Sequence, residues 1–289
     1  MREWVNRCHF GDCRNTLLAM IADGVKVQTI VTSPPYWGLR NYGAAGQIGQ
    51  EPTLPAFIAT LRDVFELCRA LLAEDGTAWV NMGDAYADRV PGLKSKDLMG
   101  QPWRLAFALQ DAGWYLRQDI IWNKPDAMPE SIRDRCTKAH EYLFLLSKNE
   151  RYFYDADAIS VPLTASSVER LSQNVADQTG SARIPGKTDG TMKAVGGESG
   201  RANRRSVWTI PTSGYSGAHF ATFPERLVEP CLLAGSRPGD IVLDPFLGSG
   251  TTAAVAQRLG RAFIGCEINP EYEALQIERL RQPGLVFAA

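Results

Sequence analysis

Residues 32–37 read T-S-P-P-Y-W and follow a short β-branched apolar run over residues 27–31. The apolar run predicts a buried strand, which the two prolines end because proline has no N–H to give to a sheet ladder. The Ser33 hydroxyl, the Pro34 carbonyl and the Tyr36 ring therefore come just past a strand end, where open α/β sheets bind their ligands. Taken alone, the stretch is equally well a proline-rich turn whose aromatic rings fill the core.

A second candidate site begins at Asp244, where residues 244–252 read D-P-F-L-G-S-G-T-T between a predicted strand and a predicted helix. Gly248 and Gly250 let a ligand approach the backbone, and the amino end of the following helix attracts a carboxylate or phosphate. Glu267 ends the next predicted strand, at about the 20-residue offset that places an acidic residue on ribose hydroxyls. The pattern indicates a nucleotide-like ligand, and a purely structural glycine turn is the alternative.

The glycine loop departs from the two common nucleotide-binding loops. T-T-A follows Gly250, so the loop lacks the G-x-G-x-x-G spacing of dinucleotide sites. No lysine follows the glycines, as it would in a phosphate-binding P-loop. A smaller adenosine-containing cofactor is therefore favoured over a dinucleotide.

Strand and helix patterns alternate along the chain, and these elements must position the two sites. Strands are predicted at residues 4–10, 27–31, 77–82, 115–122, 241–243 and 262–267, with a further strand pair at 140–147 and 152–154. Helices are predicted at residues 14–22, 102–112, 223–234, 251–259 and 270–281, and another begins after Thr53 and ends at Gly76. Strands that alternate with helices form a mostly parallel sheet, so the predicted fold class is α/β.

The composition changes between residues 159 and 205, where Ser, Thr, Gly, Asn and Gln dominate and basic residues outnumber acidic ones. Such a segment is either a solvated linker or an arm that orders on DNA. The chain therefore divides into residues 1–158 with the S-P-P-Y stretch, a basic polar insertion at 159–205, and residues 206–289 with the glycine loop. We expect the two outer parts to form one domain and the insertion to be the candidate target-recognition segment.

Composition limits the classes of function. The 289 residues carry a formal net charge of −1, so any DNA-binding surface must be local rather than global. Six scattered cysteines without a C-x-x-C pair or a nearby histidine cluster predict no metal site and no disulfide framework. No apolar run is long enough to span a membrane and the first residues lack a signal peptide, so a cytoplasmic protein is expected.

Together the two motifs resemble the beta class of S-adenosylmethionine-dependent DNA amino-methyltransferases, the N4-cytosine/N6-adenine family. T-S-P-P-Y-W is similar to the catalytic (S/D/N)-P-P-(Y/F/W) motif of that family, and D-P-F-L-G-S-G-T-T with G-C-E-I-N-P-E-Y is similar to its cofactor site. The catalytic motif comes first and the cofactor motif last, as in the circularly permuted class. Shorter matches occur at residues 11–12, 77–84, 119–125, 139–142 and 219–224.

The resemblance implies a Rossmann-like methyltransferase fold with a mostly parallel seven-stranded sheet, circularly permuted, plus the polar central insertion. It also implies S-adenosyl-L-methionine as cofactor, with Asp12 at the adenine amino group and Glu267 at the ribose hydroxyls. The residues expected along the loop and around the methionine end are Asp244, Phe246, Gly248, Ser249, Gly250, Thr251, His219, Phe220 and Thr222.

Double-stranded DNA is the substrate that the resemblance implies, and the residues expected to be catalytic are Ser33, Pro34, Pro35 and Tyr36. Ser33 and the Pro34 carbonyl would accept the two hydrogens of a base's exocyclic amine, and Tyr36 would stack on the base. DNA contacts are expected from Trp37, Arg40, Arg133, Arg135, Arg201, Arg204 and Arg205. A homodimer and a separate restriction endonuclease are further partners that the resemblance allows, and no membrane is expected.

The reaction itself explains why these groups are needed. An exocyclic amine of cytosine or adenine is a poor nucleophile because its lone pair is delocalised into the ring. Two fixed acceptors for its hydrogens free that lone pair, and in-line alignment with a methyl sulfonium supplies much of the rate. The amine is inaccessible in a duplex, so the base must flip out and stack, which gives Tyr36 its task.

Several alternatives remain open from the sequence. Ser33 favours cytosine N4 as the methylated atom, because S-P-P resembles the cytosine-N4 group, and adenine N6 is the alternative. A nicotinamide-dependent oxidoreductase is supported only by the glycine loop and Glu267. A catalytically silent nucleic-acid-binding protein is disfavoured because it would not need both sites.

Overall fold

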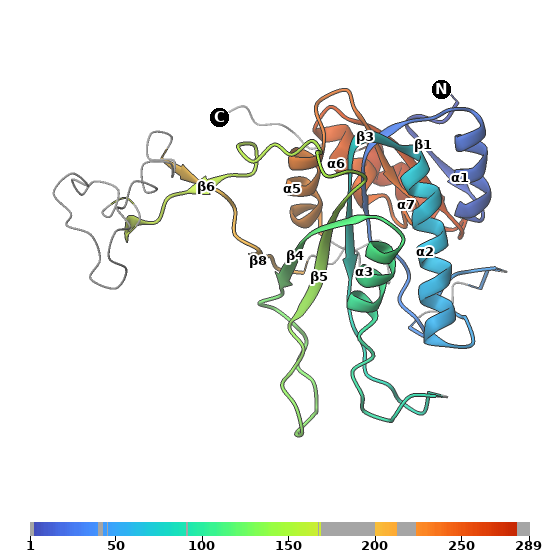
Figure 1. The fold of residues 1–289 in the computed structure, drawn as a ribbon, viewed down its shortest axis with the longest axis vertical. Coiled ribbons are helices and arrows are strands. Elements are labelled where there is room, and N and C mark those ends of the chain that lie inside the picture. Colours follow the sequence, from blue (N-terminus) through green and yellow to red (C-terminus); the bar gives the residue numbers. More distant parts are fainter. Residues whose placement is uncertain are drawn as a thin grey trace. The chain divides into compact units, whose positions relative to one another are not determined.

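Eight strands form one sheet, in the order β1-β10-β9-β2-β3-β5-β4-β8 (Figure 1). The computed structural model describes residues 3–39, 43–44, 46–90, 92–166, 168, 200–212 and 224–281. The strands are β1 (Arg7–Phe10), β2 (Val27–Thr32), β3 (Leu72–Met82), β4 (Tyr115–Asn123), β5 (His140–Ser147), β8 (Val207–Thr209), β9 (Ile241–Asp244) and β10 (Ala262–Glu267). Every neighbouring pair is parallel except those that β5 makes with β3 and β4, so the predicted mostly parallel α/β sheet is confirmed.

Helices cover both faces of the sheet. On one face lie α1 (Cys13–Ala22), α2 (Leu54–Leu71) and α3 (Gln101–Asp111), and on the other lie α5 (Glu225–Gly235), α6 (Thr251–Arg258) and α7 (Tyr272–Arg281) (Figure 1). The α2 helix begins after Thr53, whose hydroxyl accepts a hydrogen bond from the Ala56 N–H at 3.2 Å, as predicted. Because both faces are covered, β2 is buried at all six positions.

The sheet contains one strand more than the seven that the resemblance implied. The additional strand is β8, which pairs in parallel with the end of β4 and extends the edge of the sheet. Its central residue, Trp208, is 4% exposed, and the Ile121 N–H of β4 donates to the Ser206 carbonyl at 2.8 Å. A strand of three residues is too short to show a period-two pattern, which is why the sequence did not predict it.

Two local predictions were wrong. Helix α2 ends before Leu72, where the backbone becomes extended and β3 begins, rather than at Gly76. Gly76 lies inside β3, where an added Cβ would meet Leu72 Cδ2 at 2.9 Å, so this glycine permits close packing. Residues 152–154 form no strand; instead the Tyr154 ring stacks on the buried Trp79 ring at a centroid distance of 6.3 Å.

The two sequence motifs leave the sheet side by side, because β2 and β9 are neighbouring parallel strands. Ile30 of β2 pairs with Leu243 of β9, so the T-S-P-P-Y-W turn and the glycine loop follow adjacent carboxyl ends. β3 lies on one side of β2, and β9 and β10 lie on the other. Such a reversal of strand order is where open α/β sheets form their binding clefts.

The chain divides into two compact units, Met1–Tyr154 with Ser206–Ala289, and Asp155–Arg205. In the second unit β6 (Val161–Pro162) pairs antiparallel with β7 (Arg201–Ala202), and Arg201 Nε donates to Ser160 Oγ at 2.6 Å. The functional division into residues 1–158, 159–205 and 206–289 stays a prediction. In the described ranges, no helix combines the length and the apolar character needed to cross a membrane.

Candidate active site

Asp244 connects the ends of the two central strands. Its Oδ1 accepts hydrogen bonds from Thr32 Oγ1 at 2.6 Å and from the Phe246 N–H at 3.0 Å, and its Oδ2 accepts one from Thr252 Oγ1 at 2.7 Å. The residue is 1% exposed, and this burial raises the pKa of its carboxyl to about 6. Asp244 therefore fixes the start of the glycine loop against the last residue of β2.

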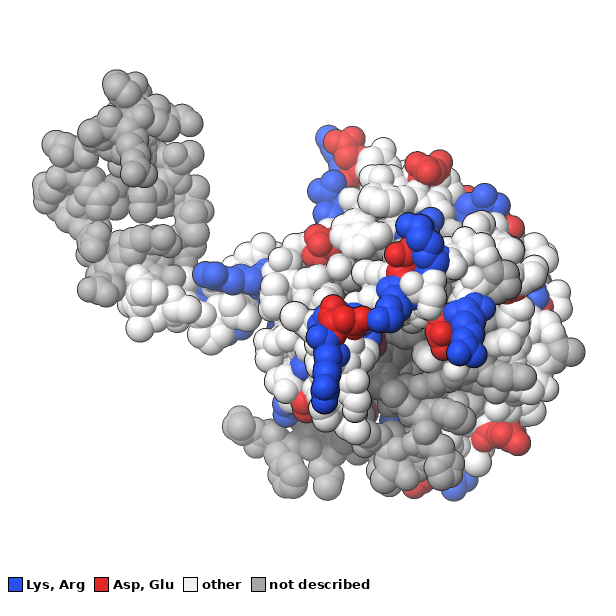
Figure 2. All heavy atoms as spheres, turned by 90° about the horizontal axis from the view of Figure 1, so that it is seen from below, with Lys and Arg blue, Asp and Glu red and all other residues white. Residues whose placement is uncertain are grey.

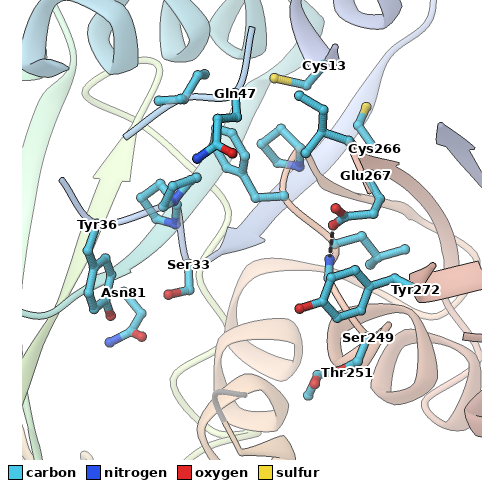
Figure 3. A pocket seen from close by; sticks show the side chains of 18 of the residues that line it. Cys13, Ser33, Tyr36, Gln47, Asn81, Ser249, Thr251, Cys266, Glu267 and Tyr272 are labelled. Carbon is cyan, nitrogen blue, oxygen red and sulfur yellow. Dashed lines mark hydrogen bonds between the residues drawn. The ribbon is translucent and has the colours of Figure 1, made fainter. Parts of the chain in front are cut away.

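A pocket of about 450 Å³ opens at the carboxyl ends of these strands. Figure 3 shows Ser33, Tyr36 and Asn81 at one end of the pocket, and Glu267, Tyr272, Ser249 and Thr251 at the other. Of the predicted site residues, those that line it are Asp12, Ser33, Pro34, Pro35, Tyr36, Phe246, Gly248, Ser249, Thr251 and Glu267. The fold therefore joins the predicted catalytic turn and most of the predicted cofactor loop in one cavity.

Glu267 holds the tip of the glycine loop. Its Oε2 accepts a hydrogen bond from the Gly248 N–H and its Oε1 accepts one from the Asn269 N–H, both at 2.8 Å. Burial raises the pKa of the Glu267 carboxyl, and the two backbone N–H groups oppose that shift. The carboxylate thus lies at the pocket wall, 8% exposed, at the end of β10.

Contacts with α7 and β10 set the path of the same loop. Gln276 Nε2 donates to the Gly248 carbonyl at 2.6 Å, and Arg279 Nη1 donates to Thr251 Oγ1 at 2.6 Å. Leu247 packs directly over Gly265 of β10, where an added Cβ would lie 2.3 Å from Leu247 Cδ2. A side chain at position 265 would therefore displace Leu247, which lines the pocket.

Asp12 serves as the N-cap of α1 and also lines the pocket. It accepts a hydrogen bond from the Arg14 N–H at 2.9 Å and pairs with the Arg14 guanidinium at 2.6 Å. The hydrogen bonds from the Arg14 side chain lower the pKa of Asp12. Asp12 is therefore a helix cap in this structure, and its contact with an adenine amino group stays a prediction.

Tyr36 is half-buried at the end of the pocket formed by the predicted catalytic turn, and it contacts two other elements. Its Oη donates a hydrogen bond to Glu141 Oε2 of β5 at 2.8 Å. An added Cβ at Gly83 would lie 2.9 Å from Tyr36 Cε2, so this glycine allows the ring its position. Burial, reinforced by the Glu141 charge, raises the pKa of Tyr36 and keeps the phenol neutral.

Asn81, near the end of β3, is a pocket residue that sequence reasoning missed. Its Nδ2 donates to the Tyr142 carbonyl at 3.1 Å, and because a carbonyl can only accept, this bond fixes which way the amide points. Its Oδ1 is buried and has no hydrogen-bond partner among the described residues. A buried acceptor without a donor at the wall of a pocket is a binding position for an N–H or O–H group.

Lys124 and Glu141 were also missed as site residues, although the W-N-K and H-E-Y stretches were noted for their resemblance. Lys124 directly follows β4, and Glu141 lies on the neighbouring antiparallel strand β5. Both line the pocket, and they form a salt bridge. Their side chains are only 19% and 16% exposed. The signal was indirect, because only the register of β4 against β5 brings the two residues together.

Two long loops extend from this end of the sheet, between β3 and α3 and between β4 and β5 (Figure 1). Lys96 of the first loop pairs with Asp134 of the second at 2.6 Å, and the Arg135 guanidinium lies 3.8 Å from the centre of the Tyr86 ring. Among the predicted DNA contacts, Arg133 is exposed on the second loop, and Arg135 also pairs with Glu130.

The structure corrects the prediction that Trp37 contacts DNA. Trp37 is 8% exposed and belongs to the hydrophobic core, with its indole N–H donating to the Glu51 carbonyl at 2.8 Å. The main-chain N–H of Trp37 donates to the buried Gln101 Oε1 at 3.1 Å. The Trp37 ring therefore holds the predicted catalytic turn against the core. The prediction failed because an aromatic residue after a turn can pack in a core as well as face solvent.

Several predicted residues are not part of the pocket wall as described. Asp244 and Gly250 shape the loop without lining the cavity. Arg201, Arg204 and Arg205 belong to the second unit. Arg40, His219, Phe220 and Thr222 lie outside the described residues. Within the described ranges, no cluster of three or more His, Cys, Asp and Glu side chains could hold a metal ion.

Comparisons with known proteins agree with this geometry. The profile of the N6_N4_Mtase family, described as DNA methylase, matches residues 27–278. The Type II methyltransferase M.XycI of Xanthomonas campestris pv. cyanopsidis is 45% identical over 288 residues, which cover 92% of this chain and 85% of that protein. The Type II methyltransferase M.SmaI of Serratia marcescens is 44% identical, with 93% and 89% covered.

Solved structures resemble the chain over almost its whole length. The PvuII DNA methyltransferase (cytosine-N4-specific) superimposes with a TM-score of 0.66 at 22% identity, covering 94% of this chain and 85% of that one, a likeness of fold. A Thermus thermophilus protein, solved in complex with S-adenosyl-L-methionine, gives a TM-score of 0.62 at 26% identity and covers 97% and 95%. By its profile match and its identity to these relatives, the chain belongs to the N6_N4_Mtase family of DNA methylases.

Proposed function

We propose that this DNA methyltransferase transfers a methyl group from S-adenosyl-L-methionine to the N4 amine of a cytosine flipped out of duplex DNA. The observation that carries the proposal is the single pocket with two different ends (Figure 3). Hydrogen-bond acceptors and an aromatic ring gather at one end, around Ser33 and Tyr36, and the Glu267-bound glycine loop forms the other. Adenine N6 is the alternative acceptor.

The residues of the glycine end fit S-adenosyl-L-methionine. Glu267 offers a carboxylate at the pocket wall for ribose hydroxyls, and Asp12 offers one for an adenine amino group. Phe246, Gly248 and the start of α6 would enclose the methionine end, where a helix amino terminus favours a carboxylate. When bound, the cofactor supplies an electrophilic methyl group on a sulfonium. The relative from Thermus thermophilus was solved with this cofactor, which supports the assignment.

The catalytic end activates the amine without a covalent enzyme intermediate. Ser33 Oγ and the Pro34 carbonyl, both at the pocket wall, would accept the two amine hydrogens and localise the nitrogen lone pair. Asn81 Oδ1 is a third acceptor at the same end and would accept a hydrogen bond from an N–H of the bound base. Tyr36 offers the surface on which the base stacks, a contact of about 1–3 kcal/mol.

Cytosine N4 is proposed as the target because Ser33 occupies the first position of the P-P-Y turn, as in the cytosine-N4 group that the motif resembles. The chain order supports assignment to the circularly permuted beta class, since the catalytic strand β2 precedes the cofactor strand β9. The Type II names of the relatives support pairing with a separate restriction endonuclease. A homodimer is a further proposal, which sedimentation of the purified chain would test.

DNA binding is proposed for the end of the sheet at which the pocket opens. Figure 2 looks onto that end, where lysine and arginine side chains lie around the middle of the surface with acidic side chains beside them. Arg133 and Arg135 lie on the loop between β4 and β5, and the basic insertion at residues 159–205 contributes Arg201, Arg204 and Arg205 as the target-recognition segment. Phosphate contacts of this kind give affinity that falls with salt.

The proposal is tested by incubating the full chain with S-adenosyl-L-methionine carrying a labelled methyl group and with duplex DNA of varied sequence. Label is expected in the DNA, and Ser33→Ala and Tyr36→Ala are expected to reduce the rate by about a hundredfold or more, through lost amine activation and lost stacking. Full activity in Ser33→Ala would overturn the assigned role of the turn.

A further inference from the structure

Lys124, which follows β4, and Glu141, which lies on β5, form a charged pair that contacts Tyr36. Glu141 Oε2 accepts the Tyr36 hydroxyl at 2.8 Å, while Glu141 Oε1 pairs with Lys124 Nζ. Both charged side chains are more than four-fifths buried, and all three residues line the pocket. Burying an ion pair costs free energy that a pair of apolar side chains would not cost, so stability alone does not explain its presence.

The pair is held in place from two sides. Lys124 Nζ lies 4.2 Å from the centre of the Trp122 ring, a cation–π contact, and Trp122 Nε1 donates to the Ile210 carbonyl at 2.8 Å. On the other side, a Cβ at Gly83 would lie 3.2 Å from Glu141 Cδ and 2.9 Å from the Tyr36 ring. Both side chains therefore have little room to turn.

The ion pair also decides which way the Tyr36 hydrogen bond runs. An ionised carboxylate can only accept, so Glu141 obliges the Tyr36 hydroxyl to donate its proton to it. The Tyr36 hydroxyl is thereby tied to β5, and its ring is held at the pocket wall beside Ser33 and Pro34.

We propose that Glu141 and Lys124 are positioning residues, which hold the Tyr36 hydroxyl and so fix the Tyr36 ring at the pocket wall for the flipped base. The inference rests on the proposed methyl transfer to an amine. Neither charged residue touches the reacting atoms; both act through Tyr36.

The test is a double-mutant cycle on the full-length enzyme with labelled S-adenosyl-L-methionine and duplex DNA. Glu141→Gln is expected to lower kcat by about ten- to a hundredfold, the equivalent of one hydrogen bond to a charged group, with little change in the KM for DNA. Tyr36→Phe removes the hydroxyl that bonds to Glu141 and keeps the ring. In the Tyr36→Phe background, Glu141→Gln is therefore expected to cost no further activity. Multiplicative losses would overturn the inference.

Two further variants separate positioning from folding. Lys124→Met with Glu141→Gln removes both buried charges together, so the protein is expected to unfold at the same denaturant concentration as wild type while kcat stays low. Glu74→Gln breaks a Glu–Lys pair with Lys148, which joins β3 to the end of β5 outside the pocket, and is expected to leave kcat unchanged. Wild-type kcat in the Lys124→Met, Glu141→Gln variant would overturn the inference and leave the methyltransferase proposal standing. A wild-type enzyme that adds no methyl group to DNA would overturn the proposed function and, with it, this inference.

Discussion

The Thr32 hydroxyl donates a hydrogen bond of 2.6 Å to Oδ1 of Asp244, between residues 212 positions apart in the chain. Thr32 ends β2, immediately before the catalytic turn, and Asp244 ends β9, immediately before the glycine loop. Both partners are at most 1% exposed. A buried hydrogen bond therefore joins the two halves of the proposed active site, together with the bond from Thr252 Oγ1 to the Val31 carbonyl at 3.2 Å.

Removing the bond between Thr32 and Asp244 should disturb both halves of the site. Thr32→Val preserves the shape of the side chain but removes one of the hydrogen bonds that Oδ1 of buried Asp244 accepts. The free energy of unfolding is therefore expected to fall by about 1–3 kcal/mol. It is also expected to weaken binding of S-adenosyl-L-methionine, because Asp244 shapes the loop. Thr29→Val is the matched control, a buried hydroxyl of the same strand that bonds to Thr77 at 3.0 Å. Urea unfolding and calorimetric titration measure the two effects; equal loss of cofactor binding in both variants would contradict the account.

Asp244 should also make stability depend on pH. Its pKa of about 6 in the folded protein exceeds its usual value of 3.8, so the folded state binds this proton more tightly than the unfolded state. Its contribution to stability is therefore full below pH 3.8 and is lost as the pH rises to about 6. The loss amounts to about 3 kcal/mol, at about 1.4 kcal/mol for each pH unit.

Urea unfolding of wild type and Asp244→Asn between pH 4 and pH 7 measures this contribution. The pKa of Glu267 is also raised, and it acts in the same direction, so the wild-type slope should shrink rather than vanish in the variant. Parallel stability curves for the two proteins would show that Asp244 titrates at its ordinary pKa.

Gly265 should be intolerant of even one methyl group. In Gly265→Ala the new Cβ would lie 2.3 Å from Leu247 Cδ2, so Leu247, which lines the pocket, must shift. We expect cofactor affinity to fall by at least about tenfold, or about 1.4 kcal/mol. Adding Leu247→Ala removes the clashing side chain and should restore part of the affinity. No recovery in the double variant would mean that the clash is not the cause.

Asn81 should show opposite effects on stability and on activity. Its Oδ1 is buried without a partner among the described residues, a state that typically costs about 1–3 kcal/mol in a folded protein. Asn81→Leu is therefore expected to leave the protein no less stable, while kcat falls by about tenfold because an acceptor for the base is lost. Thermal unfolding and methyl transfer measure the two effects. Unchanged kcat would remove Asn81 from the site.

The arginines of the second unit should govern how strongly DNA binding depends on salt. Replacing Arg201, Arg204 and Arg205 by glutamine is expected to weaken DNA binding and to reduce the slope of log affinity against log salt by about one for each phosphate that the protein no longer neutralises. Fluorescence anisotropy with labelled duplex DNA measures that slope. Identical slopes for wild type and the variant would indicate that the loops after β3 and β4, rather than these arginines, bind the DNA.

Motifs at strand ends could be predicted from the sequence because their signals are local. The prolines after residues 27–31, the glycines after Asp244 and the position of Glu267 each identify a carboxyl strand end. The topology of an α/β sheet then brings such ends together, so the pocket followed from the order of elements. Helix α2 was predictable for the same reason, through its apolar spacing and its Thr53 cap.

Residues that depend on packing or on strand register could not be predicted in the same way. Trp37 follows a turn, and only the folded core decides that its ring is buried. Glu141 and Lys124 meet because β5 runs antiparallel to β4 with Trp122 opposite Glu141, a register that no local pattern specifies. Asn81 is a candidate only because its buried Oδ1 has no donor among the residues that the structure describes, which no sequence pattern shows.

The most direct test of the central claim identifies the modified base. Duplex DNA treated with the enzyme and S-adenosyl-L-methionine is digested to nucleosides, which are separated and identified by mass. The account predicts N4-methyldeoxycytidine from wild type, and strongly reduced amounts from Ser33→Ala. N6-methyldeoxyadenosine as the product would contradict the choice of base, and DNA without any methylated nucleoside would contradict the proposed reaction.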